Sequence, residues 1–144
     1  MTVFDERFIS VIDQVDNWEE AVRLSGNLLL LDGKIEPGYI DAMIENIQKL
    51  GPYIIIAPKV ALPHARPESG VKEKGISVLV LKEPTYFGQN EVKLLICLAA
   101  VDSSSHLHLL QTIAEWLQDE NTLNRIMEAQ SVEELHEVLS KFYI

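Results

Sequence analysis

The sequence has almost none of the features of a cross-linked or exported protein. Cys97 is the single cysteine among 144 residues, so no disulfide can form within the chain. Such sparse cysteine usage is typical of a reducing compartment. The first residues, Met-Thr-Val-Phe-Asp-Glu-Arg, do not join a basic region to an apolar run, as a secretory signal would. We therefore expect a cytoplasmic protein.

Long hydrophobic runs and an excess of positive charge are also missing. The longest apolar run, residues 94–101, is far shorter than the roughly 20 residues that a membrane-spanning helix needs. We therefore expect no membrane insertion. The formal net charge is −10, which argues against nucleic acid as a partner because a phosphate backbone requires a basic surface.

Several common catalytic motifs are absent. The chain has no Walker-type phosphate loop, no GxGxxG fingerprint, no GxSxG nucleophile elbow and no paired-carboxylate signature. A zinc site fits poorly, because His106 and His108 diverge on a predicted helix and Cys97 lies in a predicted core strand. We therefore predict no metal, no cofactor, and neither nucleotide-dependent nor hydrolytic chemistry.

One histidine lies in an unusual local sequence. His64 follows Pro63 and is followed by Arg66 and Pro67, so the backbone is restricted on both sides. An imidazole whose backbone is fixed in this way is largely neutral near pH 7 and is nucleophilic on its unprotonated nitrogen. Arg66 offers a planar fork of donors for a phosphate or a carboxylate. The pattern favours phosphoryl chemistry, with a structural histidine that closes a strand as the alternative.

The first half of the chain predicts two helices. Asp16 and Glu19 resemble a capping box at the start of the first helix. Pro37 suits the first turn of the second, whose inward face carries apolar residues at helical spacing as far as Leu50. Residues 1–15 give no pattern that can be assigned.

Three strands are expected next. They are residues 53–57 with a short extension at 60–62, residues 76–82 closed by Glu83-Pro84, and residues 92–101. The last is apolar on both alternating faces, which is typical of a central strand covered on both sides. Cys97 in its middle is interpreted as a small core residue.

A helix after the last strand separates two histidines. Asp102 and the serines that follow it are candidates for the N-cap. The predicted inward stripe is His106, Leu110, Ile113 and Leu117. His108 lies about 200° around the axis from His106 and points away. A histidine in a first helical turn is well placed to meet an anion, although a core or cap role is the commoner explanation.

Two shorter helices are expected near the C-terminus. One follows Glu120, and Ser131 with Glu134 forms a capping box that opens the last helix. Its inward face reaches Phe142, whereas His136 is interpreted as solvated. The order of elements predicts a single domain over residues 1–144: an α/β sandwich with one central mixed β-sheet flanked by helices.

These motifs resemble a known family. The segment ALPHARPESGV around His64 resembles the active-site signature of the mannitol/fructose-type IIA components (EIIA type 2) of the sugar phosphotransferase system. AAVDSSSHLHLLQTIAEWL is similar to the helix that carries that family's second active-site histidine, and SVEELHEVL to its closing helix. The resemblance covers nearly the whole chain and implies the family's fold.

The resemblance implies a phosphocarrier, that is, a phosphotransferase component. It implies that His64 accepts a phosphoryl group from phospho-HPr on Nε2 and passes it to a cysteine of a IIB component, which serves a membrane IIC permease. His106 would stabilise the phosphoryl group, and Arg66 is a candidate for further electrostatic support. A backbone carbonyl or similar acceptor is expected to hold the other ring nitrogen of His64.

Asn46 is a departure from the family pattern. Mannitol and fructose members usually carry an arginine in the helix before the first strand, and Asn46 is similar in position. The residues GPYIIIAP and PHARPE resemble the ascorbate-type subgroup, so L-ascorbate uptake is the predicted role, with fructose, mannitol or another sugar as alternatives. Two alternative interpretations belong to other functional classes. One is a regulatory module whose target protein recognises phosphorylated His64, and the other is a plain interaction domain.

Overall fold

Residues 4–142, which the computed structural model describes, form a five-stranded mixed sheet with the order β1-β4-β5-β3-β2. The strands are β1 (Ile9–Ile12), β2 (Ile55–Ala57), β3 (Lys59–Ala61), β4 (Gly75–Phe87) and β5 (Asn90–Ala99). β1 is parallel to β4 and β3 is parallel to β5, whereas β4 with β5 and β2 with β3 are antiparallel. The predicted central mixed sheet is confirmed.

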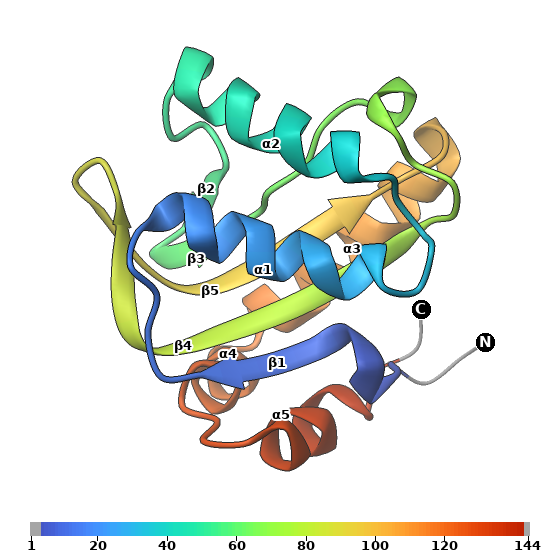
Figure 1. Cartoon of the computed structure of the whole chain (residues 1–144). Coiled ribbons are helices and arrows are strands. Elements are labelled where there is room, and N and C mark those ends of the chain that lie inside the picture. Colours follow the sequence, from blue (N-terminus) through green and yellow to red (C-terminus); the bar gives the residue numbers. More distant parts are fainter. Residues whose placement is uncertain (1–3, 143–144) are drawn as a thin grey trace.

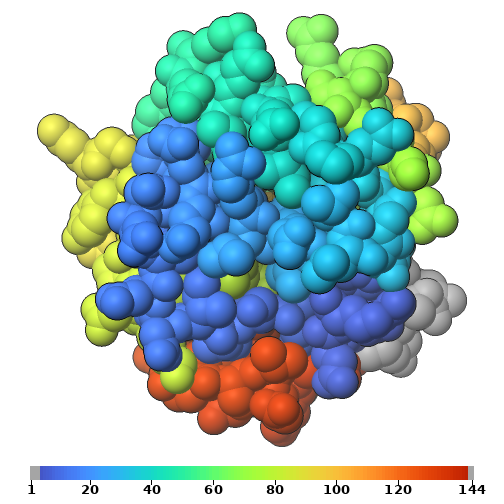
Figure 2. All heavy atoms as spheres, in the orientation of Figure 1, coloured from blue at the N-terminus to red at the C-terminus, as the bar shows by residue number. Residues whose placement is uncertain are grey.

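Helices lie on both sides of this sheet. They are α1 (Trp18–Leu30), α2 (Pro37–Leu50), α3 (Ser103–Gln118), α4 (Glu120–Met127) and α5 (Val132–Leu139), with short 3₁₀ turns η1 (Glu6–Phe8) and η2 (Pro67–Ser69). In Figure 1, α1 and α2 cross the front of the sheet and α3 lies behind it. Figure 2 shows how the side chains of α1 and α2 hide most of the sheet from this side. The α/β sandwich predicted from the sequence is therefore confirmed.

The core is centred on β5, the middle strand. Residues 94–99 are almost completely buried on both faces, as the unbroken apolar pattern predicts. Cys97 is fully buried there, and its Sγ lies 3.7 Å from the Sδ of Met43. Burial raises the pKa of the Cys97 thiol to about 12, so the thiol stays protonated at neutral pH. The interpretation of Cys97 as a core residue is confirmed.

The segment before His64 reverses direction, which the sequence interpretation missed. Residues 60–62 were expected to extend the strand at 53–57, but β2 and β3 pair antiparallel, with Ala57 opposite Val60. Pro58 and Lys59 form the tight connection, and Lys59 has a φ of 68°. A proline followed by a residue with positive φ is typical of a type II turn, where glycine is more usual. Because position 59 is a lysine and not a glycine, the residue types at this position do not indicate a turn.

β4 is longer than expected. Glu83 and Pro84 were predicted to close the strand near residue 82, but it continues to Phe87. The pairing register with β5 shifts between Val80 and Thr85. Pro84 lies inside this irregularity, where a residue without an N–H group is tolerated.

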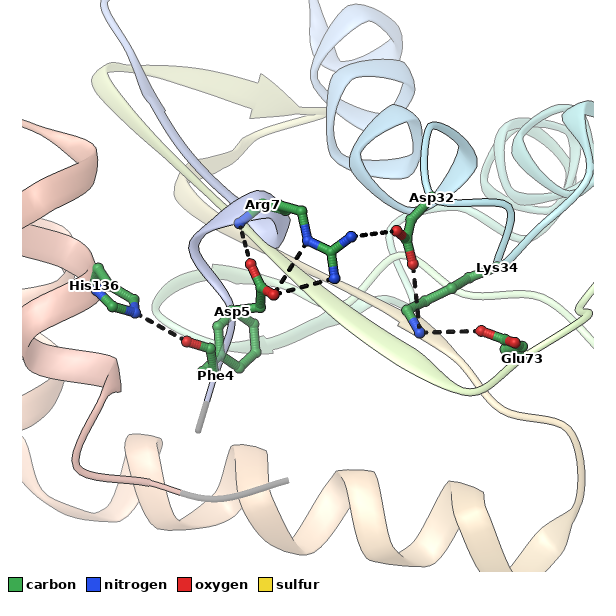
Figure 3. Close-up of polar contacts among 7 residues, drawn as sticks. All are labelled: Phe4, Asp5, Arg7, Asp32, Lys34, Glu73 and His136. Atoms are coloured by element: carbon green, nitrogen blue, oxygen red, sulfur yellow. Dashed lines mark hydrogen bonds and ion pairs between the residues drawn. The ribbon is translucent and has the colours of Figure 1, made fainter. Parts of the chain in front are cut away.

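The N-terminal segment gains its structure from its neighbours (Figure 3). The Nε2 atom of His136 on α5 lies 3.1 Å from the carbonyl oxygen of Phe4. Arg7 forms ion pairs with Asp5 at 3.1 Å and with Asp32 at 2.7 Å. The interpretation of His136 as solvated is therefore wrong: it is half-buried and bonded to the backbone of a distant segment.

Two details of the first two helices also differ from prediction. The N-cap of α1 is Asn17, whose side chain accepts from Glu20 N at 2.9 Å, while Glu20 Oε1 accepts from Asp16 N at 2.8 Å. The capping interaction is thus shifted by one residue from the predicted Asp16–Glu19 pair. Leu50, expected on the inward face of α2, is 69% exposed at the end of that helix.

The C-terminal helices follow the prediction more closely. Ser131 caps α5 by accepting from Glu134 N at 3.1 Å. α5 ends at Leu139, before Phe142, yet the Phe142 ring still packs edge-on against Trp116 with centroids 6.2 Å apart. None of the helices described here is long and apolar enough to cross a membrane.

Candidate functional site

The ring of His64 is oriented by a backbone carbonyl. Its Nδ1 lies 2.7 Å from the carbonyl oxygen of Leu62. Because a carbonyl oxygen can only accept a hydrogen bond, Nδ1 must carry the proton of the neutral ring. The lone pair is then on Nε2. The local geometry therefore favours the tautomer in which Nε2 is the nucleophile.

The backbone on either side of His64 is held by β5 and α2. The N–H group of Leu98 donates to the carbonyl oxygen of Pro63 at 3.0 Å. The N–H group of Ala65 donates to the hydroxyl oxygen of Tyr39 at 3.0 Å. These contacts add to the restriction that the prolines impose. His64 is thus fixed through both of its neighbours.

Sheet topology brings His106 to His64. β3 and β5 are adjacent and parallel, so their carboxyl ends lie at the same edge of the sheet. His64 follows β3, and His106 lies in the first turn of α3, which follows β5. The two ring centroids are 6.4 Å apart and the planes are tilted by 56°. Both histidines line one pocket of about 240 Å³.

His106 and His108 point in different directions, as predicted. His106 is half-buried at the pocket, whereas His108 is exposed. The phase of the helix was nevertheless misjudged. The buried residues of α3 are Ser105, Leu109, Thr112, Ile113 and Trp116. His106 therefore lies at the edge of the buried face rather than at its centre, which Leu109 and Trp116 occupy.

The first turn of α3 is occupied by its own cap. Asp102 Oδ1 accepts from Ser105 N at 2.8 Å, and Ser105 Oγ accepts from Asp102 N at 3.2 Å. Hydrogen bonds from Ser105 hold the pKa of the Asp102 carboxyl below its usual value, so this residue of the pocket lining stays ionised at neutral pH. The Ser105 N–H group is therefore not free for an anion, contrary to the simplest expectation for this helix end.

Arg66 does not line the pocket. Its side chain is exposed at the start of η2, next to Pro67, which does line it. Among the described residues that line the pocket, none is an arginine or a lysine. The structure thus brings His64 and His106 together and leaves Arg66 at the rim.

A family model confirms the relationship that the motifs suggested. The model described as "Phosphoenolpyruvate-dependent sugar phosphotransferase system, EIIA 2" matches residues 2–142. The chain belongs to this family.

Two curated relatives of different sugar type match over almost their whole length. The mannitol-specific cryptic phosphotransferase enzyme IIA component of Escherichia coli K12 is 39% identical over 140 residues, covering 96% of this chain and 95% of the relative. The ascorbate-specific EIIA component of the same strain is 32% identical over 141 residues, covering 95% and 92%.

Solved structures share the fold. The solution structure of the E. coli mannitol-specific cryptic IIA enzyme has a TM-score of 0.89 at 36% identity, with 97% and 96% of the two chains covered. A complex of E. coli mannitol IIA with phosphorylated mannitol IIB has a TM-score of 0.82 at 26% identity, with 96% and 98% covered.

A tyrosine near Asn46 packs against the candidate site. The ring of Tyr53 lies edge-on to the ring of His64, with centroids 5.7 Å apart and planes at 72°. Burial raises the pKa of Tyr53, and a hydrogen bond with Asn46 partly offsets this effect. Asn46 therefore lies close to Tyr53, which in turn packs against His64.

Sequence reasoning missed Tyr39 and Tyr53 as residues beside His64 in the candidate site. Tyr39 fell within a correctly predicted helix, but only its apolar neighbours were assigned to the inward face. A usable signal existed, because a buried tyrosine hydroxyl normally needs a hydrogen-bond partner.

Within residues 4–142, no group of three or more His, Cys, Asp or Glu side chains is arranged to hold a metal ion.

Proposed function

We propose that this EIIA-family protein is a phosphocarrier that accepts a phosphoryl group from phospho-HPr on Nε2 of His64 and passes it to a cysteine of a IIB component. The observation that carries the proposal is the contact between His64 Nδ1 and the Leu62 carbonyl. It leaves Nε2 unprotonated on a ring that lines the pocket shared with His106.

The chemistry is two displacements at phosphorus. The Nε2 lone pair attacks the phosphorus of phospho-HPr, and the bond from phosphorus to its donor atom breaks, returning that electron pair to HPr. A thiolate of the IIB component then attacks, the phosphorus–Nε2 bond breaks, and its electron pair returns to His64. Nδ1 keeps its proton throughout. Positioning and electrostatic stabilisation are what such transfers require from the protein.

His106 is the proposed stabilising group. No arginine or lysine lines the described pocket, so His106 is the side chain there, besides the proposed nucleophile His64, that can carry a positive charge. As an imidazolium it would donate to an equatorial phosphoryl oxygen, a charge-assisted hydrogen bond. Arg66, at the rim, is proposed to add positive potential for the incoming phosphoprotein.

The surface around the pocket suits a protein partner. Val101 and Leu107, which flank the α3 cap, are 42% and 58% exposed, and Tyr53 is 42% exposed. Exposed apolar side chains beside a reactive group are typical of a docking surface. The related mannitol IIA has been solved in complex with its phosphorylated IIB, which supports a IIB component as the acceptor here.

L-Ascorbate remains the proposed sugar, with mannitol, fructose or another sugar as the alternatives. The support is the amino-acid sequence of residues 51–68, which resembles the ascorbate-type subgroup, and the neutral side chain of Asn46. Mannitol-type and ascorbate-type relatives match at comparable identity, 39% and 32%, so the comparisons leave this assignment as a prediction.

Phosphorylation of His64 gives the direct test. Incubation with phosphoenolpyruvate, enzyme I and HPr should add one acid-labile phosphoryl group, detected as an intact-mass increase that acid removes. The group should be absent in His64→Ala and present in the control His136→Ala, whose histidine contacts Phe4 away from the pocket. Full labelling of His64→Ala would overturn the proposal.

A further inference from the structure

Tyr39 lies beneath the segment that carries His64. It is in the first turn of α2 and is completely buried. Its hydroxyl donates to the carbonyl oxygen of Leu98 at 2.7 Å and accepts from the N–H group of Ala65 at 3.0 Å. The single hydroxyl therefore joins α2, β5 and the residue that follows His64.

Leu98 completes the arrangement from the other side. Its carbonyl accepts from Tyr39, and its N–H group donates to the carbonyl of Pro63 at 3.0 Å. The hydrogen bonds thus run from Pro63 through Leu98 and Tyr39 to Ala65, enclosing the backbone of His64. Linked hydrogen bonds in a buried setting reinforce one another and resist displacement.

We propose that Tyr39 is a positioning residue for phosphoryl transfer, fixing the His64 backbone so that Nδ1 stays on the Leu62 carbonyl and Nε2 stays available. This rests on the phosphocarrier function proposed above. Tyr39 is completely buried and cannot touch a protein partner. It lines the pocket, but its hydroxyl is engaged by Leu98 and Ala65, so it acts through the backbone of His64. Burial raises the pKa of Tyr39 well above its usual value, so the hydroxyl stays neutral and keeps both its donor and its acceptor role.

The test compares Tyr39→Phe with a matched control. Ser77→Ala also removes one fully buried hydroxyl that donates to a backbone carbonyl, that of Ser25 at 2.6 Å, but this contact joins β4 to α1. Both variants should melt at lower temperatures than the wild type. Only Tyr39→Phe should slow phosphorylation by phospho-HPr, by about ten- to a hundredfold, since small misplacements of a reacting group cost rates of this order.

Two readouts separate positioning from a general loss of stability. The KM for phospho-HPr should be unchanged in Tyr39→Phe while kcat falls, because the docking surface is intact. The ¹⁵N shifts of the His64 ring should show a smaller population protonated on Nδ1 than in the wild type and in Ser77→Ala. The ring measurement needs no phosphoryl donor, so it reports on positioning by itself.

A second variant keeps the test independent of folding. Incorporation of 3,5-difluorotyrosine at position 39 retains the hydroxyl and strengthens it as a donor to Leu98, but makes its oxygen a weaker acceptor for Ala65 N–H. Because only the bond to the segment of His64 is weakened, both readouts should change in the same direction and by less. A wild type that phospho-HPr does not label would overturn the proposed function and with it the transfer role of Tyr39. If the wild type is labelled but Tyr39→Phe has the same kcat and the same His64 ring protonation, the role of Tyr39 alone would be overturned.

Discussion

The imidazole rings of His64 and His106 lie with their centroids 6.4 Å apart at the mouth of one pocket. They come from different elements, one following β3 and the other in the first turn of α3. The parallel pairing of β3 with β5 places the two connections side by side. The proposed nucleophile His64 and a second histidine thus share a pocket with no arginine or lysine in its described lining.

His106→Ala should slow phosphoryl transfer by roughly 10- to 150-fold, because a hydrogen bond to a charged group contributes about 1.5–3 kcal/mol. Rapid-quench kinetics with phospho-HPr measures this directly. His108→Ala is the matched control on the same helix, and its exposed side chain predicts a nearly unchanged rate. Equal losses in the two variants would contradict the assignment of His106 to the site.

Arg66→Ala should reduce kcat/KM for phospho-HPr by more than about fivefold, the equivalent of the 1 kcal/mol that bounds most exposed ion pairs. The loss should appear mainly in KM and shrink at high salt, because Arg66 is exposed at the rim and acts on the approaching partner. Arg23→Ala is a suitable control, since Arg23 pairs with Asp41 at 3.4 Å on the α1–α2 surface. A salt-independent loss confined to kcat would instead place Arg66 in the chemical step.

The phosphorylated protein should transfer to an ascorbate-type IIB domain faster than to mannitol- or fructose-type IIB domains. This expectation rests on the neutral Asn46, which stands where the resemblance to mannitol and fructose members predicts an arginine. Single-turnover transfer to each purified IIB domain measures the preference. The Asn46→Arg variant should show a smaller difference in transfer rate between the ascorbate-type and the other IIB domains. Equal or faster transfer to a mannitol-type domain would refute the ascorbate assignment and leave the phosphocarrier function standing.

Asp102→Ala should lower the melting temperature at neutral pH, because it removes the cap that accepts from Ser105 N. The pKa of Asp102 is depressed in the folded state. Its contribution is therefore fully present above the unfolded-state value of about 3.9 and is lost as the pH falls through the lower folded-state value. Thermal melts between pH 7 and pH 2 should show the wild-type and Asp102→Ala curves converging below about pH 3.9. A constant difference across this range would show that the ionised carboxylate is not what stabilises the cap.

Local signals in the sequence determined the parts of the site that depend on neighbouring residues. The prolines around His64 restrict its backbone, Pro37 begins α2, and Asp102 begins α3. Helical periodicity separated His106 from His108. These features depend on φ, ψ and side-chain period over a few residues, so they can be read without knowledge of the fold.

The tertiary structure determined which of these segments lie in contact with one another. β1 is a short strand that exists because it pairs with β4, and His136 reaches the backbone of Phe4 only in the folded chain. Lys59 adopts a positive φ because the β2–β3 pairing requires a reversal there. The hydroxyl of Tyr39 contacts Ala65 and Leu98 because the folded chain places the first turn of α2 beside the carboxyl end of β5. Such contacts depend on which distant groups packing brings within hydrogen-bond distance, and no spacing along the chain encodes that choice.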